Sequence, residues 1–117
     1  MLLDPTMSAL HASLRGLAAR QRVIADNVAN LETPGFLAGT VDFESTLQNA
    51  MASHADADAV MPTYGKSLAA TGPNGNNVNL DQETLALEQT NLRYQLGVES
   101  VNNKLHLLRT AISGEPS

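Results

Sequence analysis

The chain of 117 residues has no cysteine and no tryptophan, and only two phenylalanines and two tyrosines. The lack of cysteine excludes disulfides, thiolate zinc sites and cysteine nucleophiles. Hydrophobic residues still make up 43 % of the chain. Since aromatic side chains are scarce, Ala, Leu and Val must supply the apolar surface, which suits the seams between helices better than a thick globular core. The length fits one domain or one elongated module.

Positive charge and long apolar runs are also scarce. Seven Lys and Arg residues stand against twelve Asp and Glu residues, for a net charge of −5. Nucleic-acid binding needs clustered basic residues, so that class of function is excluded. No stretch reaches the roughly 18 apolar residues of a membrane span. Asp4 and Pro5 stand where a secretory signal would carry basic residues. The sequence therefore predicts either a cytoplasmic protein or export by a route without a cleaved signal.

Apolar residues near the N-terminus recur at alternating steps of three and four, which predicts a long helix with a coiled-coil seam. Asp4 before Pro5 is expected to cap its start, because proline lacks the N–H that would be unpaired there. Pro34 disfavours helix in the preceding residue and Gly35 tolerates positive φ, so the helix should end near Asn30. The seam positions are Met7, Leu10, Leu14, Leu17, Gln21, Ile24, Val28 and Leu31, with Leu3 extending the row backwards.

A second, longer heptad pattern fills the C-terminal third. Asn79 is expected to cap its start, with Gln82 in a capping-box position, and Gly114 is a natural residue to end it. At 1.5 Å per residue this helix would run on the order of 50 Å. Its seam positions are Leu80, Thr84, Leu87, Asn91, Tyr94, Val98, Val101, Leu105, Leu108 and Ile112.

The middle of the chain has a different composition. Val41, Phe43 and Leu47 indicate a short extended piece followed by a helical turn. Residues 50–59 have few bulky side chains and are expected to bury little, and residues 45–70 are expected to be flexible. Asn74-Gly75 is a candidate type I′ turn. The predicted fold is all-α and elongated, with an N-terminal coiled-coil helix (1–33), a loop-rich middle with at most short extended segments (34–79) and a C-terminal coiled-coil helix (80–117).

Chemical sites are weakly indicated. His54, Asp56 and Asp58 place three possible metal ligands two residues apart, but no further ligand cluster lies near them in sequence. The Gly- and Asn-rich stretch at 71–77 lacks the Gly-Lys-Ser/Thr ending of a phosphate-binding loop. No spacing marks a nucleophile with its base. We therefore expect no catalytic residue, metal, cofactor or small-molecule substrate.

The heptads allow two interpretations. The chain could fold as a helical hairpin that hides its own seam, or its helices could pack among several subunits. A second apolar row off the seam favours the second interpretation, because one partner helix cannot cover both rows. Gly97 is costly inside a helix and is expected where another backbone approaches closely. The second row consists of Leu85, Leu92, Leu96 and Leu107.

Two seam positions carry amides. If the two helices fold back antiparallel, with Leu31 near Leu80, Gln21 and Asn91 fall within one turn of each other. They could then form a polar layer that fixes the register, as buried amides do in coiled coils. Alternatively, each could face solvent or a different subunit.

The stretch "IADNVANLETPGF" (24–36) resembles the N-terminal signature shared by bacterial flagellar rod and hook proteins. "VDFE" (41–44), "GNNVNLDQE" (75–83) and "NLRYQ" (91–95) resemble the FlgB-type proximal rod proteins in particular. The departures are Phe36 for the usual Tyr, Leu37 where a basic residue is common, and Asn79 where Asp is frequent.

This resemblance implies a structural subunit of the flagellar basal body, stacked helically into the rod that transmits motor torque. It implies export through the flagellar type III apparatus without signal cleavage, and a place in the periplasmic rod. The implied partners are other copies and other rod subunits, the adaptor at the rod base, the membrane ring protein and the export apparatus. Two alternatives remain at this point: a cytoplasmic coiled-coil adaptor or export-chaperone-like regulator, and a small hydrolase using His54 and the nearby aspartates.

The expected assembly interface follows both seams, and the expected signature turn follows the first helix. The helix exit should make every subunit present the same surface; an ordinary helix stop would use the same chemistry within one chain. The interface positions are Leu10, Leu14, Leu17, Gln21, Ile24, Val28, Leu31, Leu87, Asn91, Tyr94, Val98, Val101, Leu105, Leu108 and Ile112. The turn positions are Asn27, Asn30, Thr33, Pro34, Gly35 and Phe36.

Overall fold

The computed structural model describes residues 4–114 of the chain. Within these residues it contains three α-helices, one 3₁₀ helix and two short strands. In chain order they are α1 (Pro5–Ala29), β1 (Gly39–Asp42), α2 (Glu44–Ala52), the 3₁₀ helix η1 (Ala57–Ala59), β2 (Thr63–Lys66) and α3 (Leu80–Ser113). Leu3 and the end of the predicted C-terminal segment, 115–117, lie outside the described residues.

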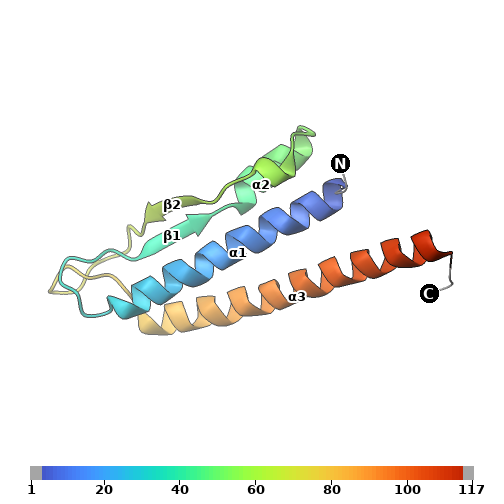
Figure 1. Ribbon diagram of the computed structural model, residues 1–117. Helices are drawn as coiled ribbons and strands as arrows, with labels where there is room; N and C mark the ends of the chain where they lie inside the picture. Colours follow the sequence, from blue (N-terminus) through green and yellow to red (C-terminus); the bar gives the residue numbers. More distant parts are fainter. Residues whose placement is uncertain (1–3, 115–117) are drawn as a thin grey trace.

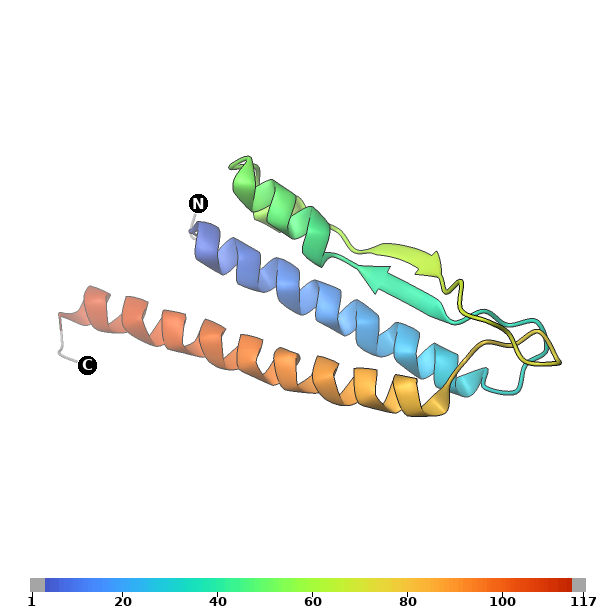
Figure 2. The same cartoon turned by 180° about the vertical axis from the view of Figure 1, so that it is seen from behind.

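The chain is elongated, with principal extents of 64 × 28 × 15 Å. Its radius of gyration is 18.0 Å, against about 13 Å for a compact domain of 100 residues. Figure 1 shows α1 in the middle, with α3 antiparallel on one side and the two strands with α2 on the other. Figure 2 shows that α3 runs past the start of α1 at its C-terminal end. The predicted elongated pair of terminal helices is confirmed.

Local capping chemistry sets the ends of both long helices as predicted. The Asp4 side chain accepts a hydrogen bond from Met7 N–H, with Pro5 in the first helical turn, and Asn30 ends α1. The Asn79 side chain accepts from Gln82 N–H at the start of α3. Gly114 ends α3 in the left-handed conformation, with φ 73°. Among the described residues, no helix is both long and apolar enough to cross a membrane.

The middle segment holds more structure than the sequence predicted. β1 and β2 pair antiparallel, from Gly39 opposite Lys66 to Asp42 opposite Thr63. The predicted extended piece and helical turn correspond to β1 and α2. The expectation that residues 50–59 bury little is wrong at Ala57, which forms a buried cluster with Leu47, Val60 and Ala12 of α1. Flexibility of this segment in solution stays a prediction.

Phe43 fixes the middle segment onto α1. Its ring is 4 % exposed and occupies the notch left by Gly16. A Cβ at Gly16 would lie 2.1 Å from the ring, so no larger residue fits there without displacing it. Burying one Phe side chain stabilises a fold by roughly 1.5–3 kcal/mol. One of the few aromatic residues therefore fastens the strand layer to the helix pair.

The turn at 72–75 differs from the prediction. Of Asn74 and Gly75, only Gly75 has positive φ, so the turn is not of type I′. It closes by a 2.9 Å hydrogen bond from Gly75 N–H to the Gly72 carbonyl, with Pro73 in its second position. Proline favours that position of a type I turn because its ring fixes φ.

Candidate assembly surface

The contact between α1 and α3 is tight and uses small residues on α3. A Cβ at Gly97 would lie 2.8 Å from Leu14 Cδ2, so the leucine of α1 fills the notch that glycine leaves. The expected close approach at Gly97 is therefore real, but the approaching group is a side chain of the same chain. Gly97 gives no support to packing between subunits, and that part of the interpretation is wrong.

Polar contacts set the register of the two helices. Gln21 Nε2 donates to Asn91 Oδ1 at 2.8 Å. Lys104 Nζ lies 2.7 Å from Asp4 Oδ2 at one end of α1, and Asn27 Nδ2 donates to Glu83 Oε1 at 2.8 Å near the other. The predicted meeting of Gln21 and Asn91 is confirmed. Because Asn91 is exposed, the pair lies at the margin of the helix contact and is not a buried layer.

The face of α3 that meets α1 coincides with the predicted seam only in part, at positions such as Tyr94 and Val101. Thr90 is its one buried residue among those described, and Glu83, Ala86, Gly97 and Val101 are half-buried along the same line. Leu87 precedes Thr90 by three residues and lies to one side of this line, where it is 36 % exposed. The coiled-coil seam expected on α3 is therefore not confirmed as the contact within the chain.

The predicted interface positions have different environments in the single chain. On α1, Leu17 and Ile24 are buried, whereas Val28 is exposed. Leu17 and Ile24 therefore need no neighbouring subunit to cover them. The half-buried positions are Leu10, Leu14, Gln21, Leu31, Tyr94 and Val101, and the exposed ones on α3 are Leu87, Asn91, Val98, Leu105, Leu108 and Ile112.

Two rows of large apolar side chains on α3 remain uncovered. Leu92 follows Thr90 by two residues, a rotation of about 200°, so its row faces away from α1. The far row consists of Leu85, Leu92, Leu96 and Leu107, which are 53–59 % exposed. The flanking row consists of Leu80, Leu87, Val98 and Leu105, which are 36–46 % exposed. Leu108, 43 % exposed, lies five full turns from Thr90 on the line that faces α1, beyond the last pairing of the two helices at Lys104. A soluble monomer rarely exposes contiguous apolar surface of this kind unless the surface binds a partner.

The signature residues of the helix exit bond mainly within the chain. Asn27 is 1 % exposed; its Nδ2 donates to Gly39 O and Glu83 Oε1, and its Oδ1 accepts from Gly39 N–H. Asn30 donates to Asp26 O at 2.8 Å. Because Asn27 is buried in its own subunit, it cannot face another one. For Asn27, the ordinary helix stop is the correct interpretation.

Gly35 and the aromatic residue complete this turn. Gly35 has φ 73°, as predicted, and its N–H donates to Asn74 O at 2.9 Å. Phe36 is half-buried, and Lys66 Nζ lies 5.5 Å from its ring centroid. Thr33 Oγ1 donates to Asn30 Oδ1, a hydrogen bond between two residues of the same turn. Pro34 is exposed.

Two asparagines that the sequence analysis did not single out hold the exit in place. Asn76 is 7 % exposed and donates from Nδ2 to Asn30 O at 2.8 Å and Thr33 O at 2.9 Å. Asn77 donates to Ser67 O and its Oδ1 accepts from Ala38 N–H. Asn76 therefore gives a second donor to two carbonyls that already accept the N–H groups of Thr33 and Phe36, and ties the exit to the segment before α3. The "GNN" stretch was the available signal, but the partners of Asn76 at the end of α1 lie more than forty residues away in sequence.

Two arginines of α1, also missed from sequence, tie down the middle segment. Arg15 donates to Asp58 Oδ1 and to the carbonyls of Asp58 and Val60. Arg20 donates to both carboxylate oxygens of Glu44 at 2.7–2.8 Å, and to Val41 O. These hydrogen bonds from Arg20 lower the pKa of Glu44 to about 2.

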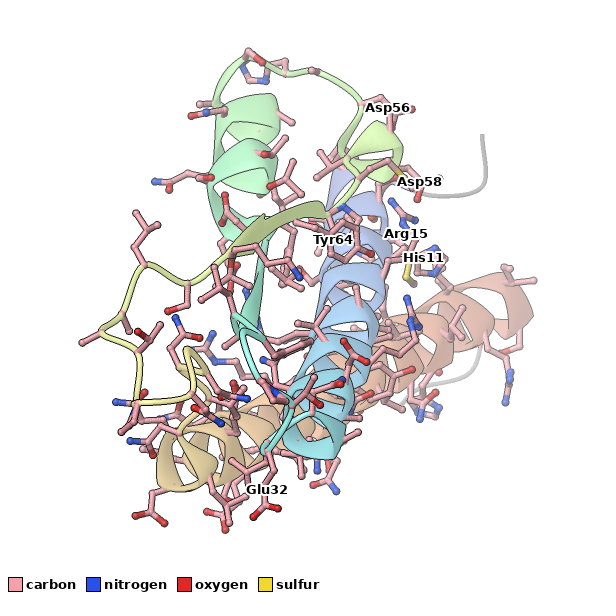
Figure 3. All side chains as sticks on the ribbon, turned by 90° about the vertical axis from the view of Figure 1, so that its left-hand side faces the viewer. His11, Arg15, Glu32, Asp56, Asp58 and Tyr64 are labelled. Atoms are coloured by element: carbon pink, nitrogen blue, oxygen red, sulfur yellow. The ribbon has the colours of Figure 1, made fainter. Side chains whose placement is uncertain are left out.

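The possible metal ligands do not form a site. Figure 3 shows Asp58 turned toward Arg15 and Asp56 at the start of η1. Asp56 Oδ1 accepts from Asp58 N–H, and Asp58 is paired with Arg15. No group of three His, Cys, Asp or Glu side chains suited to a metal occurs among residues 4–114. The carboxylates are used in local structure.

The chain is similar in sequence to proteins of the bacterial flagellum. A family model described as "Flagella basal body rod protein" matches residues 6–36. The chain is 32 % identical to the flagellar basal body rod protein FlgB of Bacillus subtilis, over 97 % of each chain. It is 28 % identical to that of Escherichia coli, over 88 % of this chain and 89 % of the relative. It is also 32 % identical to the flagellar basal body rod protein FlgB of Borreliella burgdorferi, over 74 % of this chain and 79 % of the relative.

Proposed function

This chain belongs to the FlgB family of flagellar basal body rod proteins and is a structural subunit of the rod; from that premise we propose that α3 carries the contacts that build the rod. The hypotheses of a cytoplasmic adaptor and of a hydrolase are set aside. Assembly with other rod components follows from the family. We propose here which surface of the chain makes each of these contacts with other rod components.

The observation that carries this proposal is the pair of uncovered apolar rows on α3. One line of α3 is occupied by α1, and the far and flanking rows point in two further directions. A helix with three apolar or close-packed sides needs more than one neighbour to bury them. The two rows would then contact two different neighbours. The far row would use Leu85, Leu92 and Leu96, and the flanking row would use Leu87 and Val98.

The finer partners belong to the same proposal. We assign the two rows of α3 to contacts with other copies and with other rod subunits, in a helical array that transmits torque. The adaptor at the rod base, the membrane ring and export through the type III apparatus to the periplasmic rod follow from the family resemblance alone. Among the predicted interface positions, the exposed α3 members are proposed to contact neighbours, whereas the buried Leu17 and Ile24 are not.

The test separates assembly from folding. A chain carrying Leu92→Gln and Leu96→Gln should keep its helix content by circular dichroism, because both side chains are more than half exposed. It should fail to restore swimming to a strain lacking its own copy, and should be absent from detergent-extracted basal bodies. The matched control carries Glu88→Gln and Glu99→Gln, two exposed polar positions of the same helix, and should assemble.

Export is measured in the same strains. If the double leucine variant reaches the culture medium but not the basal body, the defect lies in assembly. Normal incorporation of that variant into basal bodies would exclude the far row as a rod contact. Equal failure of the Glu88→Gln, Glu99→Gln control would show that α3 tolerates no surface change, and the row would lose its special role.

A further inference from the structure

The two-stranded sheet has two edges, and the register identifies which backbone groups point outward from each. Ser67 N–H donates to Ala38 O at 2.8 Å, so this pair belongs to the hydrogen-bonded positions of the ladder. Such positions alternate in an antiparallel pair. Gly39, Val41, Tyr64 and Lys66 therefore direct their N–H and C=O groups away from the partner strand.

The outer edge of β1 is covered by side chains of α1. Asn27 Oδ1 accepts from Gly39 N–H at 2.8 Å and its Nδ2 donates to Gly39 O at 3.1 Å, so the amide replaces a neighbouring strand. Arg20 Nη2 donates to Val41 O at 2.7 Å. No further strand can pair with this edge.

The outer edge of β2 has no such cover. All four residues of β2 are exposed, and in both ribbon views β2 is the strand farther from α1. Within residues 4–114, nothing bonds the outward N–H and C=O groups of Tyr64 and Lys66. Unpaired strand edges are templates for pairing with another chain.

The sequence of this edge selects one register for pairing with itself. Pairing centred on Lys66 would set two lysines directly opposite each other, which is destabilising. Pairing centred on Tyr64 would set Pro62, which has no N–H, opposite Lys66 and leave the Lys66 carbonyl, within β2, without a partner on each side. Pairing centred on Gly65 sets Tyr64 opposite Lys66 twice, and every outward group of these two residues gains a partner.

We propose that β2 binds β2 of a second copy of this chain, antiparallel and centred on Gly65, to give one continuous four-stranded sheet. Pro62 would lie opposite Leu68 and accept from its N–H; the bond that proline cannot donate is lost at the Leu68 carbonyl, outside the four residues of β2. The contact is small compared with the roughly 1,200 Å² of a stable interface, so the dimer forms at high protein concentration. This inference does not depend on how α3 packs in the rod.

Cysteine cross-linking tests the register, since the natural chain has no cysteine. In the proposed pairing Gly65 faces its own copy at a non-hydrogen-bonded position, with Cα atoms roughly 4.5 Å apart, within disulfide range. Thr63 on the same face would lie roughly 13 Å from its copy, out of range. Purified Gly65→Cys chain should therefore form disulfide dimers on mild oxidation, increasingly with concentration, and Thr63→Cys chain should not.

The outcomes decide the proposal. A Cβ at Gly65 lies 3.0 Å from Thr40 Oγ1, so circular dichroism and amide exchange must show that the Gly65→Cys chain keeps its sheet. Folded Gly65→Cys chain that stays monomeric, or equal cross-linking of the Thr63→Cys chain, would overturn the proposal. In the latter case the disulfides would report random collision.

Sedimentation of cysteine-free variants gives a second, independent readout. Tyr64→Pro removes an outward N–H and leaves the β1–β2 ladder bonds in place, so it should abolish the concentration-dependent dimer. Tyr64→Ala keeps that N–H and should retain most of the dimer. Equal behaviour of these two variants would contradict strand pairing, as would a natural chain that stays monomeric at every concentration.

Discussion

At the scale of single residues, the helix exit depends on amide groups whose donors and acceptors are all used. Asn76 donates to two carbonyls at the end of α1 while its Oδ1 accepts from Val78 N–H at 2.7 Å. It is 7 % exposed, so water cannot replace a lost partner easily. A buried polar group left unsatisfied costs about 1–3 kcal/mol. The shape of the exit is therefore sensitive to single atoms.

Replacing Asn76 by Asp tests this directly. The Asn76→Asp change puts a carboxylate oxygen against the carbonyls of Asn30 and Thr33, and should lower the free energy of unfolding by about 1–3 kcal/mol at pH 7. Protonation below about pH 4 restores a donor and should recover part of the loss. Urea denaturation at both pH values measures it. Asn74→Asp, where the exposed side chain only accepts, should have little effect.

Gly35 isolates a backbone requirement. No atom lies within 4 Å of a Cβ placed there, but φ is 73°, which strains a β-branched residue. Gly35→Val should therefore abolish rod assembly while synthesis and export continue, and Gly35→Asn should still assemble because Asn tolerates this conformation. Swimming and basal-body fractionation measure both. Normal swimming with valine would show that the turn is not needed.

Residue-level prediction from sequence succeeded where the signal is local. The predicted roles of Asp4 and Asn79 as caps and of Gly35 as a positive-φ residue depend only on the neighbouring backbone, and each is confirmed. Asn76 and Arg15 act on partners more than forty residues away, so no local pattern could identify them. Long-range partners of polar side chains are set by the fold as a whole.

At the scale of elements, the helix pair was predictable in direction and approximate register but not in its contact face. The apolar pattern of α3 marks its large side chains, whereas the close contact with α1 uses Ala86, Thr90 and Gly97. Small residues let two helices approach, yet they add little to a hydrophobic pattern. A periodic row of leucines therefore identified a surface that the single chain leaves exposed.

The Gln21–Asn91 bond between the helices should show as a coupling energy. Changing either residue to Leu leaves the other without its partner, so the double variant should lose about 0.5–1 kcal/mol less stability than the two single losses summed. Urea denaturation of the four proteins gives the value. A cycle of Gln21→Leu with Gln95→Leu, an exposed position one turn on, should be additive. Additivity in both cycles would show that the Gln21–Asn91 hydrogen bond contributes nothing to the free energy of unfolding.

The Arg20–Glu44 pair gives a pH dependence of known sign. The pKa of Glu44 falls from 4.5 to about 2 on folding, so its contribution is complete above pH 4.5 and lost as pH falls toward 2. The Glu44 side chain is 45 % exposed, which limits the contribution to less than about 1 kcal/mol. Glu44→Gln should flatten the loss of stability between pH 4.5 and 2, measured by urea midpoints. An unchanged slope would contradict this assignment.

At the scale of the whole molecule, α3 is longer than the helix that supports it. It has 34 residues against 25 in α1, and the last pairing between them joins Lys104 to Asp4. Beyond it, Leu105, Leu108 and Ile112 are exposed. Within residues 4–114, no side-chain hydrogen bond or ion pair joins residues 105–112 to α1.

The end of α3 should open more readily than its start in the isolated subunit. Amide hydrogens of residues 106–113 should exchange at least about tenfold faster than those of residues 86–100, because short unsupported helices are marginal in water. Hydrogen exchange with mass spectrometry measures this on the free chain. In assembled basal bodies the difference should shrink. Uniform protection in the free chain would show that the end needs no neighbour.

The bond set of Asn77 has a consequence for how the middle segment can change in length. By bonding Ala38 on one side and Ser67 and Ala69 on the other, Asn77 closes residues 39–66 at their base. The entropy of closing such a loop grows only with the logarithm of its length, so doubling the loop costs about 0.6 kcal/mol. The exposed loop between α2 and η1 can therefore take extra residues, or a whole inserted module, while the helix pair on the other side of the closure keeps its geometry.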